Sequence, residues 1–154
     1  MKNLYVSGTP QFAGTFGVRY FIDYWFLGAN LNAFGRNYID VAPARRMEGI
    51  YNTVDPTLPE TMDTYYAMTT QERIGSACTL DLSVGKIFYL RNRQSINFNL
   101  SVNNVLNKRD IRTGGYEQAR VFASDGALVN PALFPNKYYY MQGINCFANI
   151  SYRF

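Results

Sequence analysis

Five segments of the chain alternate between apolar and polar residues, and this alternation limits the fold more than any other feature. In SINFNLSVNN, every second residue from Ile96 to Val102 is apolar, and the residues between them are Asn or Ser. Successive side chains of a strand point to opposite faces, so this period of two predicts two-faced strands; a helical period is weak throughout. We therefore predict an all-β fold, an antiparallel meander of about five long strands at about residues 10–22, 25–41, 72–90, 95–107 and 137–154.

The connections between these predicted strands alternate in length. Tight turns follow residues 22 and 90, whereas long loops without a clear element of their own occupy about residues 42–71 and 108–136. In an antiparallel meander, this order places every tight turn at one end of the sheet and every long loop at the other end. Transmembrane β-barrels of the outer membrane have the same asymmetry, with short periplasmic turns and long extracellular loops.

The apolar side of the predicted sheet needs a cover. The sequence offers no amphipathic helix and no second set of strands for this role, so lipid is the favoured cover. Aromatic residues gather near both predicted ends of the strands, and the headgroup level of a membrane favours Tyr and Trp. The expected girdle residues are Tyr20, Tyr24, Trp25, Phe88, Tyr89, Tyr152 and Phe154 near the tight turns, and Tyr38, Tyr138, Tyr139 and Tyr140 near the long loops.

Alternation alone also fits a soluble antiparallel sheet whose apolar face packs on a core. A soluble β-sandwich or small β-barrel that acts as a binding module therefore stays open as the alternative. Five strands are too few to close a transmembrane barrel, and an open edge in lipid would leave backbone groups without partners. The pattern therefore predicts either a soluble β protein or the C-terminal part of a longer barrel.

The composition argues against several other classes of function. The chain has no His, which removes the commonest general base and the usual Ser–His or Cys–His pairs, so we do not expect an enzyme. Two isolated cysteines, Cys78 and Cys146, do not make a metal site, and no cofactor is expected. The net charge of +4 comes without a run of basic residues, so nucleic acid is not an expected partner. Arg45 and Arg46 form the longest basic cluster, for which a solvated loop is the simpler interpretation.

More specific motifs occur in the second half of the chain. They are the stretch TLDLSVGKIFYLRNRQSINFNLSVNNVLNKRDIRTGGYEQAR and, further on, FPNKYYYMQGINCFANISYRF, in which NVLN, GGYEQAR and KYYYMQG are the most distinctive segments. Together they resemble the C-terminal end of SusC/RagA-type TonB-dependent outer-membrane transporters of Bacteroidetes. The upstream stretches GTPQFAGTFGVRYF and NAFGRNYIDVAPARR resemble the preceding strands of that family, so the resemblance extends from about Ser7 to Phe154.

This resemblance implies that the chain is the C-terminal part of a large transmembrane β-barrel of about 22 strands, filled by an N-terminal plug. It implies a location in the cell outer membrane and a role in nutrient import, with oligosaccharides or peptides as the substrates. The expected partners are the remaining barrel and plug of the same transporter, a SusD-like surface lipoprotein, outer-membrane lipid, and TonB through an N-terminal part missing from these residues. The chain itself would supply the last barrel strands and two extracellular loops.

Candidate ligand contacts lie in the predicted loops and on the polar strand faces. In RDIRTGGYEQAR, the ring of Tyr116 could stack on a sugar while charged neighbours bind its hydroxyls, but Gly114 and Gly115 are also expected to form a plain turn there. In MDTYYAM, two tyrosines could meet a ligand or the lipoprotein, or could pack within their own loop. Asp81, Asn103 and other polar strand residues are expected to line a hydrated lumen. The candidate ligand-binding set is Tyr65, Tyr66, Arg112, Tyr116, Arg120, Asn97 and Asn99.

The segment GINCFANISYRF carries a further predicted feature, because its apolar residues recur at every second position and end on an aromatic residue. By resemblance, this pattern is a signal for the outer-membrane assembly machinery, made of Ile144, Ala148, Ile150, Tyr152 and Phe154. Cys78 and Cys146 lie on the predicted apolar faces of non-adjacent strands, so both are expected to be free thiols that face lipid.

Overall fold

The structure is a computed structural model that describes residues 4–52, 57–120, 123–124, 127–128 and 134–154. Parts of the two predicted loops, at 53–56, 121–122, 125–126 and 129–133, lie outside the described residues. The chain forms two compact units. The sheet unit comprises Gln11–Gly35, Ser76–Ile111 and Tyr140–Phe154, and the loop unit comprises Met1–Pro10, Arg36–Gly75 and Arg112–Tyr139.

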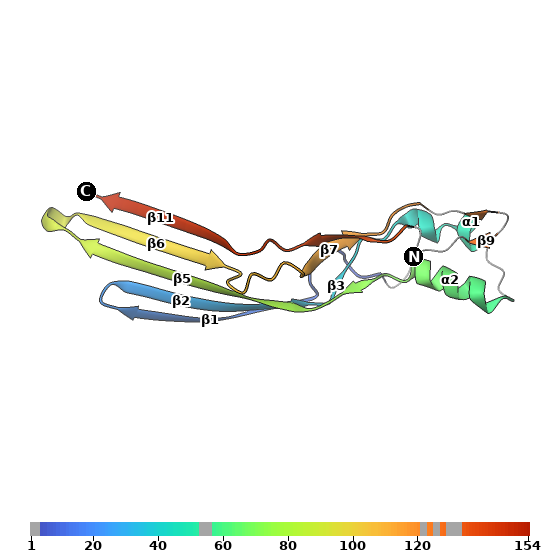
Figure 1. Cartoon of the computed structure of the whole chain (residues 1–154), viewed down its shortest axis with the longest axis horizontal. Coiled ribbons are helices and arrows are strands. Elements are labelled where there is room, and N and C mark those ends of the chain that lie inside the picture. Colours follow the sequence, from blue (N-terminus) through green and yellow to red (C-terminus); the bar gives the residue numbers. More distant parts are fainter. Residues whose placement is uncertain (1–3, 53–56, 121–122, 125–126, 129–133) are drawn as a thin grey trace. The chain divides into compact units, whose positions relative to one another are not determined.

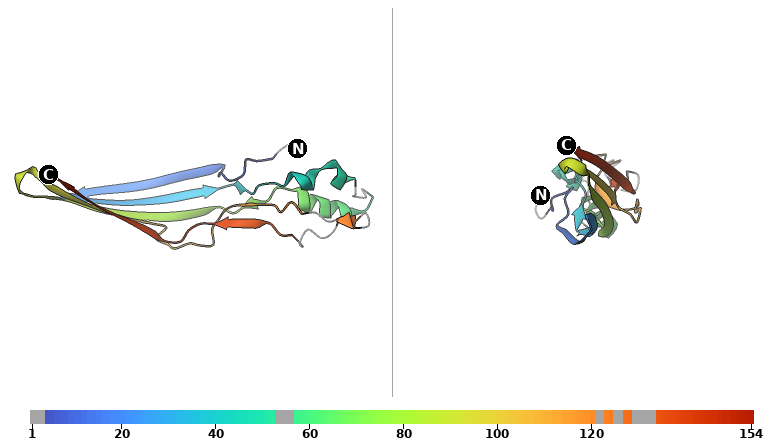
Figure 2. Two further views of the ribbon diagram at one scale, coloured as in Figure 1. Left: turned by 90° about the horizontal axis from the view of Figure 1, so that it is seen from above. Right: turned by 90° about the vertical axis from the view of Figure 1, so that its left-hand side faces the viewer.

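The sheet unit is built around one antiparallel sheet of five strands (Figure 1). They are, in spatial order, β1 (Phe12–Ile22), β2 (Trp25–Gly35), β5 (Ala77–Tyr89), β6 (Ser95–Asn103) and β11 (Asn145–Arg153). Each strand pairs antiparallel with the next one, and the strands twist along the sheet (Figure 2). The predictions of a mainly β fold and of an antiparallel meander are therefore confirmed.

The two tight turns lie at the same end of this sheet. β1 and β2 are joined by Asp23 and Tyr24, whose φ angles are both positive at 45° and 66°. Positive φ at both central residues is typical of a type I′ turn, whose twist matches that of the flanking strands. β5 and β6 are joined by the short 3-10 helix η2 (Arg91–Arg93), within which Asn92 and Arg93 also have positive φ.

The register aligns equivalent residues on the same face of all five strands. One cross-strand row is apolar and contains Tyr20, Leu27, Val84, Leu100 and Ala148. The neighbouring row lies on the other face and contains Arg19, Gly28, Ser83, Ser101 and Phe147. The sheet therefore has one apolar face and one mainly polar face.

Four of the predicted strands are shortened or interrupted, namely those expected at 25–41, 72–90, 95–107 and 137–154. β2 ends at Gly35, and the next residue, Arg36, has a φ of 55°, which is outside strand geometry. β6 ends at Asn103 for the same reason, since Asn104 has a φ of 50°. Alternation of residue types cannot reveal such left-handed positions, so the predicted strands ran past them.

Short elements occur in the described parts of the two predicted long loops, which corrects the expectation that these loops lack structure. In the second loop, β7 (Arg112–Tyr116) pairs with β10 (Lys137–Tyr140), which follows the loop, and β8 (Ala123–Ser124) pairs with β9 (Ala127–Leu128). The remaining two-stranded sheet among the described residues pairs β3 (Asn37–Tyr38) with β4 (Arg73–Ile74), on either side of the first loop. The described helical segments here are η1 (Pro43–Arg46), α1 (Glu48–Tyr51) and α2 (Pro59–Thr69).

Helix α2 and two isoleucines define the interior of the loop unit. Pro59 at the first helical position suits a helix start, and among the residues of α2 only Met68 is buried. Ile39 and Ile74 are the largest fully buried side chains among the described residues, at 0% and 1% exposure. No helix in the described ranges is long and apolar enough to cross a membrane.

Candidate functional site

The apolar face of the sheet unit is one candidate surface. Phe16 and Ile150 are each 71% exposed there, and Val18 is 56% exposed. A shallow hollow of about 460 Å³ on this face is lined almost entirely by aliphatic groups, including Leu82 and Leu100. A contiguous exposed apolar surface of this kind marks a site of contact with a membrane or another molecule.

Aromatic rings gather at the tight-turn end of the same sheet. The rings of Tyr24 and Tyr89 meet edge to face, with 5.0 Å between their centres. The ammonium group of Lys86 lies 4.4 Å from the ring centre of Trp25 and 5.1 Å from that of Phe88. A long cationic side chain can pack its stem against apolar rings while its charged group stays in water.

The polar face carries a hydrogen-bonded cluster centred on Asp81. Its carboxylate accepts a hydrogen bond from the Asn32 side chain at 2.6 Å and from the backbone N–H of Asn104 at 2.8 Å. Asn32 also accepts from the Thr15 hydroxyl at 2.9 Å. The cluster therefore crosses from β1 to the end of β6 and uses most of its own hydrogen-bonding capacity.

Two of the predicted ligand-binding residues, Asn97 and Asn99, belong to this polar face. Both are half-buried residues of β6, and the Asn99 amide donates to the Asn97 side-chain oxygen at 3.3 Å. Asn103, at the end of the same strand, donates to the Asn145 side chain at 2.9 Å. These residues share one face, as the alternation predicts.

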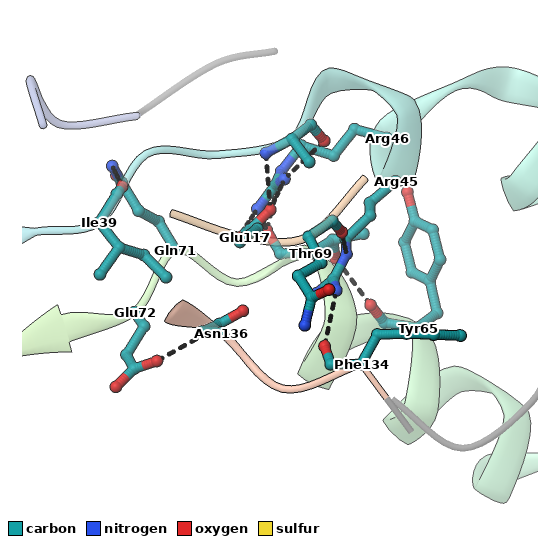
Figure 3. A network of polar contacts seen from close by, with 12 residues as sticks. Ile39, Arg45, Arg46, Tyr65, Thr69, Gln71, Glu72, Glu117, Phe134 and Asn136 are labelled. Atoms are coloured by element: carbon teal, nitrogen blue, oxygen red, sulfur yellow. Dashed lines mark hydrogen bonds and ion pairs between the residues drawn. The ribbon is translucent and has the colours of Figure 1, made fainter. Parts of the chain in front are cut away.

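In the loop unit, a buried ion pair joins segments that are distant in sequence (Figure 3). The guanidinium of Arg46 donates to both carboxylate oxygens of Glu117, at 2.6 and 2.8 Å, and their side chains are only 7% and 2% exposed. The same guanidinium donates to the carbonyl of Thr69, and Glu117 also accepts from the N–H of Ala42. The pair thus connects η1, the end of α2 and the segment after β7.

Arg45 makes a second set of contacts beside this pair. Its side chain donates to the carbonyls of Gln118 and Phe134, at 2.7 and 3.1 Å, and the residue is only 4% exposed. The interpretation of Arg45 and Arg46 as a solvated basic loop is therefore wrong. Because a guanidinium has five donors in a fixed plane, each arginine can satisfy several carbonyl groups at once. The sequence could not reveal this arrangement, because the acceptors of Arg45 lie far from it along the chain.

Arg112, a predicted ligand contact, is engaged within the loop unit. One of its nitrogens lies 3.6 Å from a carboxylate oxygen of Glu72, and its guanidinium lies 4.1 Å from the ring centre of Tyr138. Glu72 also accepts hydrogen bonds from the Tyr138 hydroxyl and from the Asn136 side chain. A ligand that bound Arg112 would have to compete with these contacts.

The two glycines of the GGYEQAR motif lie inside strand β7, so the expectation of a plain turn at Gly114 and Gly115 is wrong. A Cβ atom on Gly115 would collide with the Lys137 carbonyl and approach Ile39 at 3.2 Å. Gly115 therefore lets β10 approach β7 closely. Tyr116 follows it and is 41% exposed, with its ring centre 6.0 Å from that of Tyr139.

The other predicted loop contacts occupy separate places in the loop unit. Tyr65 and Tyr66 lie on α2, where Tyr65 contacts the ring of Tyr51 and Tyr66 is 56% exposed. Arg120 lies 5.7 Å from the ring centre of Phe134. The contacts found among the described residues do not join the two helical tyrosines with Arg112 or Tyr116 into one site.

The predicted assembly-signal residues lie on and beside β11. Ala148, Ile150 and Tyr152 are in the strand, on the apolar face, whereas Ile144 precedes it and Phe154 follows it. Tyr152 and Phe154 have ring centres 6.3 Å apart, and Phe154 is 95% exposed.

The two cysteines are free, as predicted. Cys78 on β5 and Cys146 on β11 are separated by β6, and Cys78 lies 3.8 Å from the ammonium group of Lys108. In the described part of the chain, no group of three or more His, Cys, Asp or Glu residues is placed to hold a metal ion.

Comparison of the chain with family models, with curated proteins and with solved structures gives no match. Its function must therefore be inferred from the geometry of the two units and from the sequence motifs.

Proposed function

We propose that the chain is a component of a TonB-dependent outer-membrane importer of oligosaccharides or peptides, in which its strands form part of the barrel wall. The observation that carries this proposal is the exposed apolar face of the five-stranded sheet. Its strands have 11, 11, 13, 9 and 9 residues. A strand needs about 9–11 residues to cross the hydrocarbon core of a bilayer, so each of them is long enough.

The edges of the sheet support the same proposal. β1 and β11 each have one strand neighbour among the described residues, so one side of each carries backbone groups that no strand pairs. In a membrane such groups require partners, since each unsatisfied group costs several kcal/mol. In the proposed transporter, the remaining strands of the same barrel pair with these two edges.

The expected partners follow from this assignment and from the resemblance of the motifs. The loop unit supplies the extracellular loops, whose exposed Tyr66 and Tyr139 offer aromatic contacts to a SusD-like surface lipoprotein or to a substrate. The plug, through which TonB acts, fills the barrel on the side of the polar face.

The state of the purified full chain in solution tests this proposal. We expect the refolded chain to stay dispersed only in detergent or with partner strands, because the apolar face would otherwise associate. Size-exclusion chromatography with light scattering, with and without detergent, measures this property. A single folded monomer in plain buffer would contradict the proposal and support the soluble binding module instead.

A further inference from the structure

A second hollow lies on the polar face of the sheet unit, and its volume is about 240 Å³. It lies over two adjacent cross-strand rows, one with Arg19, Gly28, Ser83 and Ser101, the other with Phe21, Phe26, Gly85 and Asn99. Gly28 and Gly85 provide a floor of bare backbone. A Cβ on Gly28 would lie 2.5 Å from the Ser83 hydroxyl oxygen, and one on Gly85 would lie 2.5 Å from the Asn99 side-chain oxygen.

Most of the polar side chains around this hollow are available to a ligand; the exception is Asn99, which donates to Asn97. Within the ranges that the structure describes, no side-chain hydrogen bond or ion pair engages Arg19, Asn30, Ser83 or Ser101. The neighbouring cluster on the same face differs, because Asp81 there is already bound by Asn32 and Asn104. The polar face therefore has two parts. Around Asp81 the polar side chains hydrogen-bond to one another, whereas Arg19, Asn30, Ser83 and Ser101 make no such bonds with any described residue.

The charge and the walls of the hollow narrow the choice of ligand. Arg19 contributes a positive charge, and no acidic residue lines the hollow. Phe21 and Phe26 form one wall, with their rings edge to face and 5.4 Å between the centres. The volume is smaller than the roughly 300–1,000 Å³ of sites for drug-sized ligands, so a solute with a single ring fits it best.

We propose that this hollow binds a small hydroxylated carboxylate, namely a sugar acid of one ring. The guanidinium of Arg19 would take the carboxylate through paired N–H donors, which is the strongest arrangement available to such a pair. Ser83, Ser101 and Asn30 would exchange hydrogen bonds with the ring hydroxyls, and the apolar C–H face of the sugar would lie against the phenylalanine wall. This assignment depends on the register of the sheet unit and holds whatever covers the apolar face.

Calorimetric titration of the refolded full chain with D-glucuronate tests this site, with D-glucose as the uncharged probe. The titration is run in whichever medium, detergent or buffer, keeps the chain dispersed, so its outcome is independent of the membrane assignment. We expect saturable binding of glucuronate and binding of glucose that is weaker by about tenfold or more, because glucose lacks the charge-assisted pair. Arg19→Gln should weaken glucuronate binding to a similar extent. The matched control, Arg153→Gln, removes the same charge from the same face outside the hollow and should leave the affinity unchanged.

A second variant separates the shape of the site from its charge. Ser101→Val removes a hydroxyl group and narrows the hollow without a change of charge, and Val is well tolerated in strands. We expect it to weaken glucuronate binding severalfold while circular dichroism shows unchanged strand content. The site would be rejected by an absence of saturable binding, by equal affinities for glucuronate and glucose, or by unchanged affinity in both Arg19→Gln and Ser101→Val.

Discussion

Among single residues, Arg46 and Glu117 form a charge pair that is almost completely removed from water. A buried pair of this kind is a weak source of net stability, since desolvation offsets much of the attraction. Here, however, the two side chains also satisfy backbone groups of Ala42 and Thr69. Loss of one partner would leave the other charge buried together with unpaired backbone groups.

We therefore expect Glu117→Ala to destabilise the loop unit by about 3–5 kcal/mol, the usual cost of breaking a buried ion pair from one side. Urea unfolding of the full chain measures the change in free energy. Hydrogen exchange at the amide of Ala42, which donates to Glu117, should accelerate locally. Arg112→Gln is the control, because its pair with Glu72 is partly exposed and should contribute at most about 1 kcal/mol. Equal losses from the two variants would show that the burial of Glu117 has no special role.

Among secondary-structure elements, the five long strands of the sheet unit could be predicted from the sequence, although not all of their ends, whereas the helices of the loop unit could not. Alternation of apolar and polar residues predicted these strands because each strand has one apolar and one polar face, as Leu100 and Asn99 on β6 illustrate. The loop unit is organised instead by contacts such as Arg46 with Glu117, which are 71 positions apart. No local period encodes a contact at that separation. The hollow on the polar face could not be predicted either. It depends on which residues of neighbouring strands lie opposite one another, and the pattern of a single strand does not contain this register.

The assignment of the two sheet faces makes a prediction about β6. Leu100→Arg should reduce insertion of the chain into lipid vesicles, because Arg near the middle of a bilayer costs about 2–4 kcal/mol on the lipid face. Asn99→Arg adds the same side chain one position away on the polar face and should insert almost normally. Protease protection and heat-dependent gel mobility of the inserted chain measure the effect. Similar insertion of the two variants would contradict the assignment of the apolar face to lipid.

For the whole molecule, the proposed role as part of an outer-membrane barrel requires that the assembly machinery recognise the chain as well as that the chain fold. The apolar face has aliphatic rows in its middle and aromatic rings at the tight-turn end, where Phe88 on β5 and Tyr152 on β11 are both cross-strand partners of Ile96 on β6. Phe154 extends this aromatic group and is nearly fully exposed. An exposed ring in this place contributes little to the fold, so a role in contact with lipid or with the assembly machinery explains it better.

Substitution of Phe154 therefore tests assembly with little effect on folding. We expect Phe154→Ser to lower the fraction of chain recovered in the outer membrane, while strand content in detergent stays unchanged. Phe147→Ser is the matched control, since Phe147 is also an exposed aromatic residue of this segment, at 65%, but lies on the polar face opposite Ser101. Membrane fractionation after coexpression with the upstream part of the proposed barrel measures both variants. If both reach the membrane equally well, Phe154 has no part in the assembly signal, and the aromatic rings of the apolar face act only as an interfacial girdle.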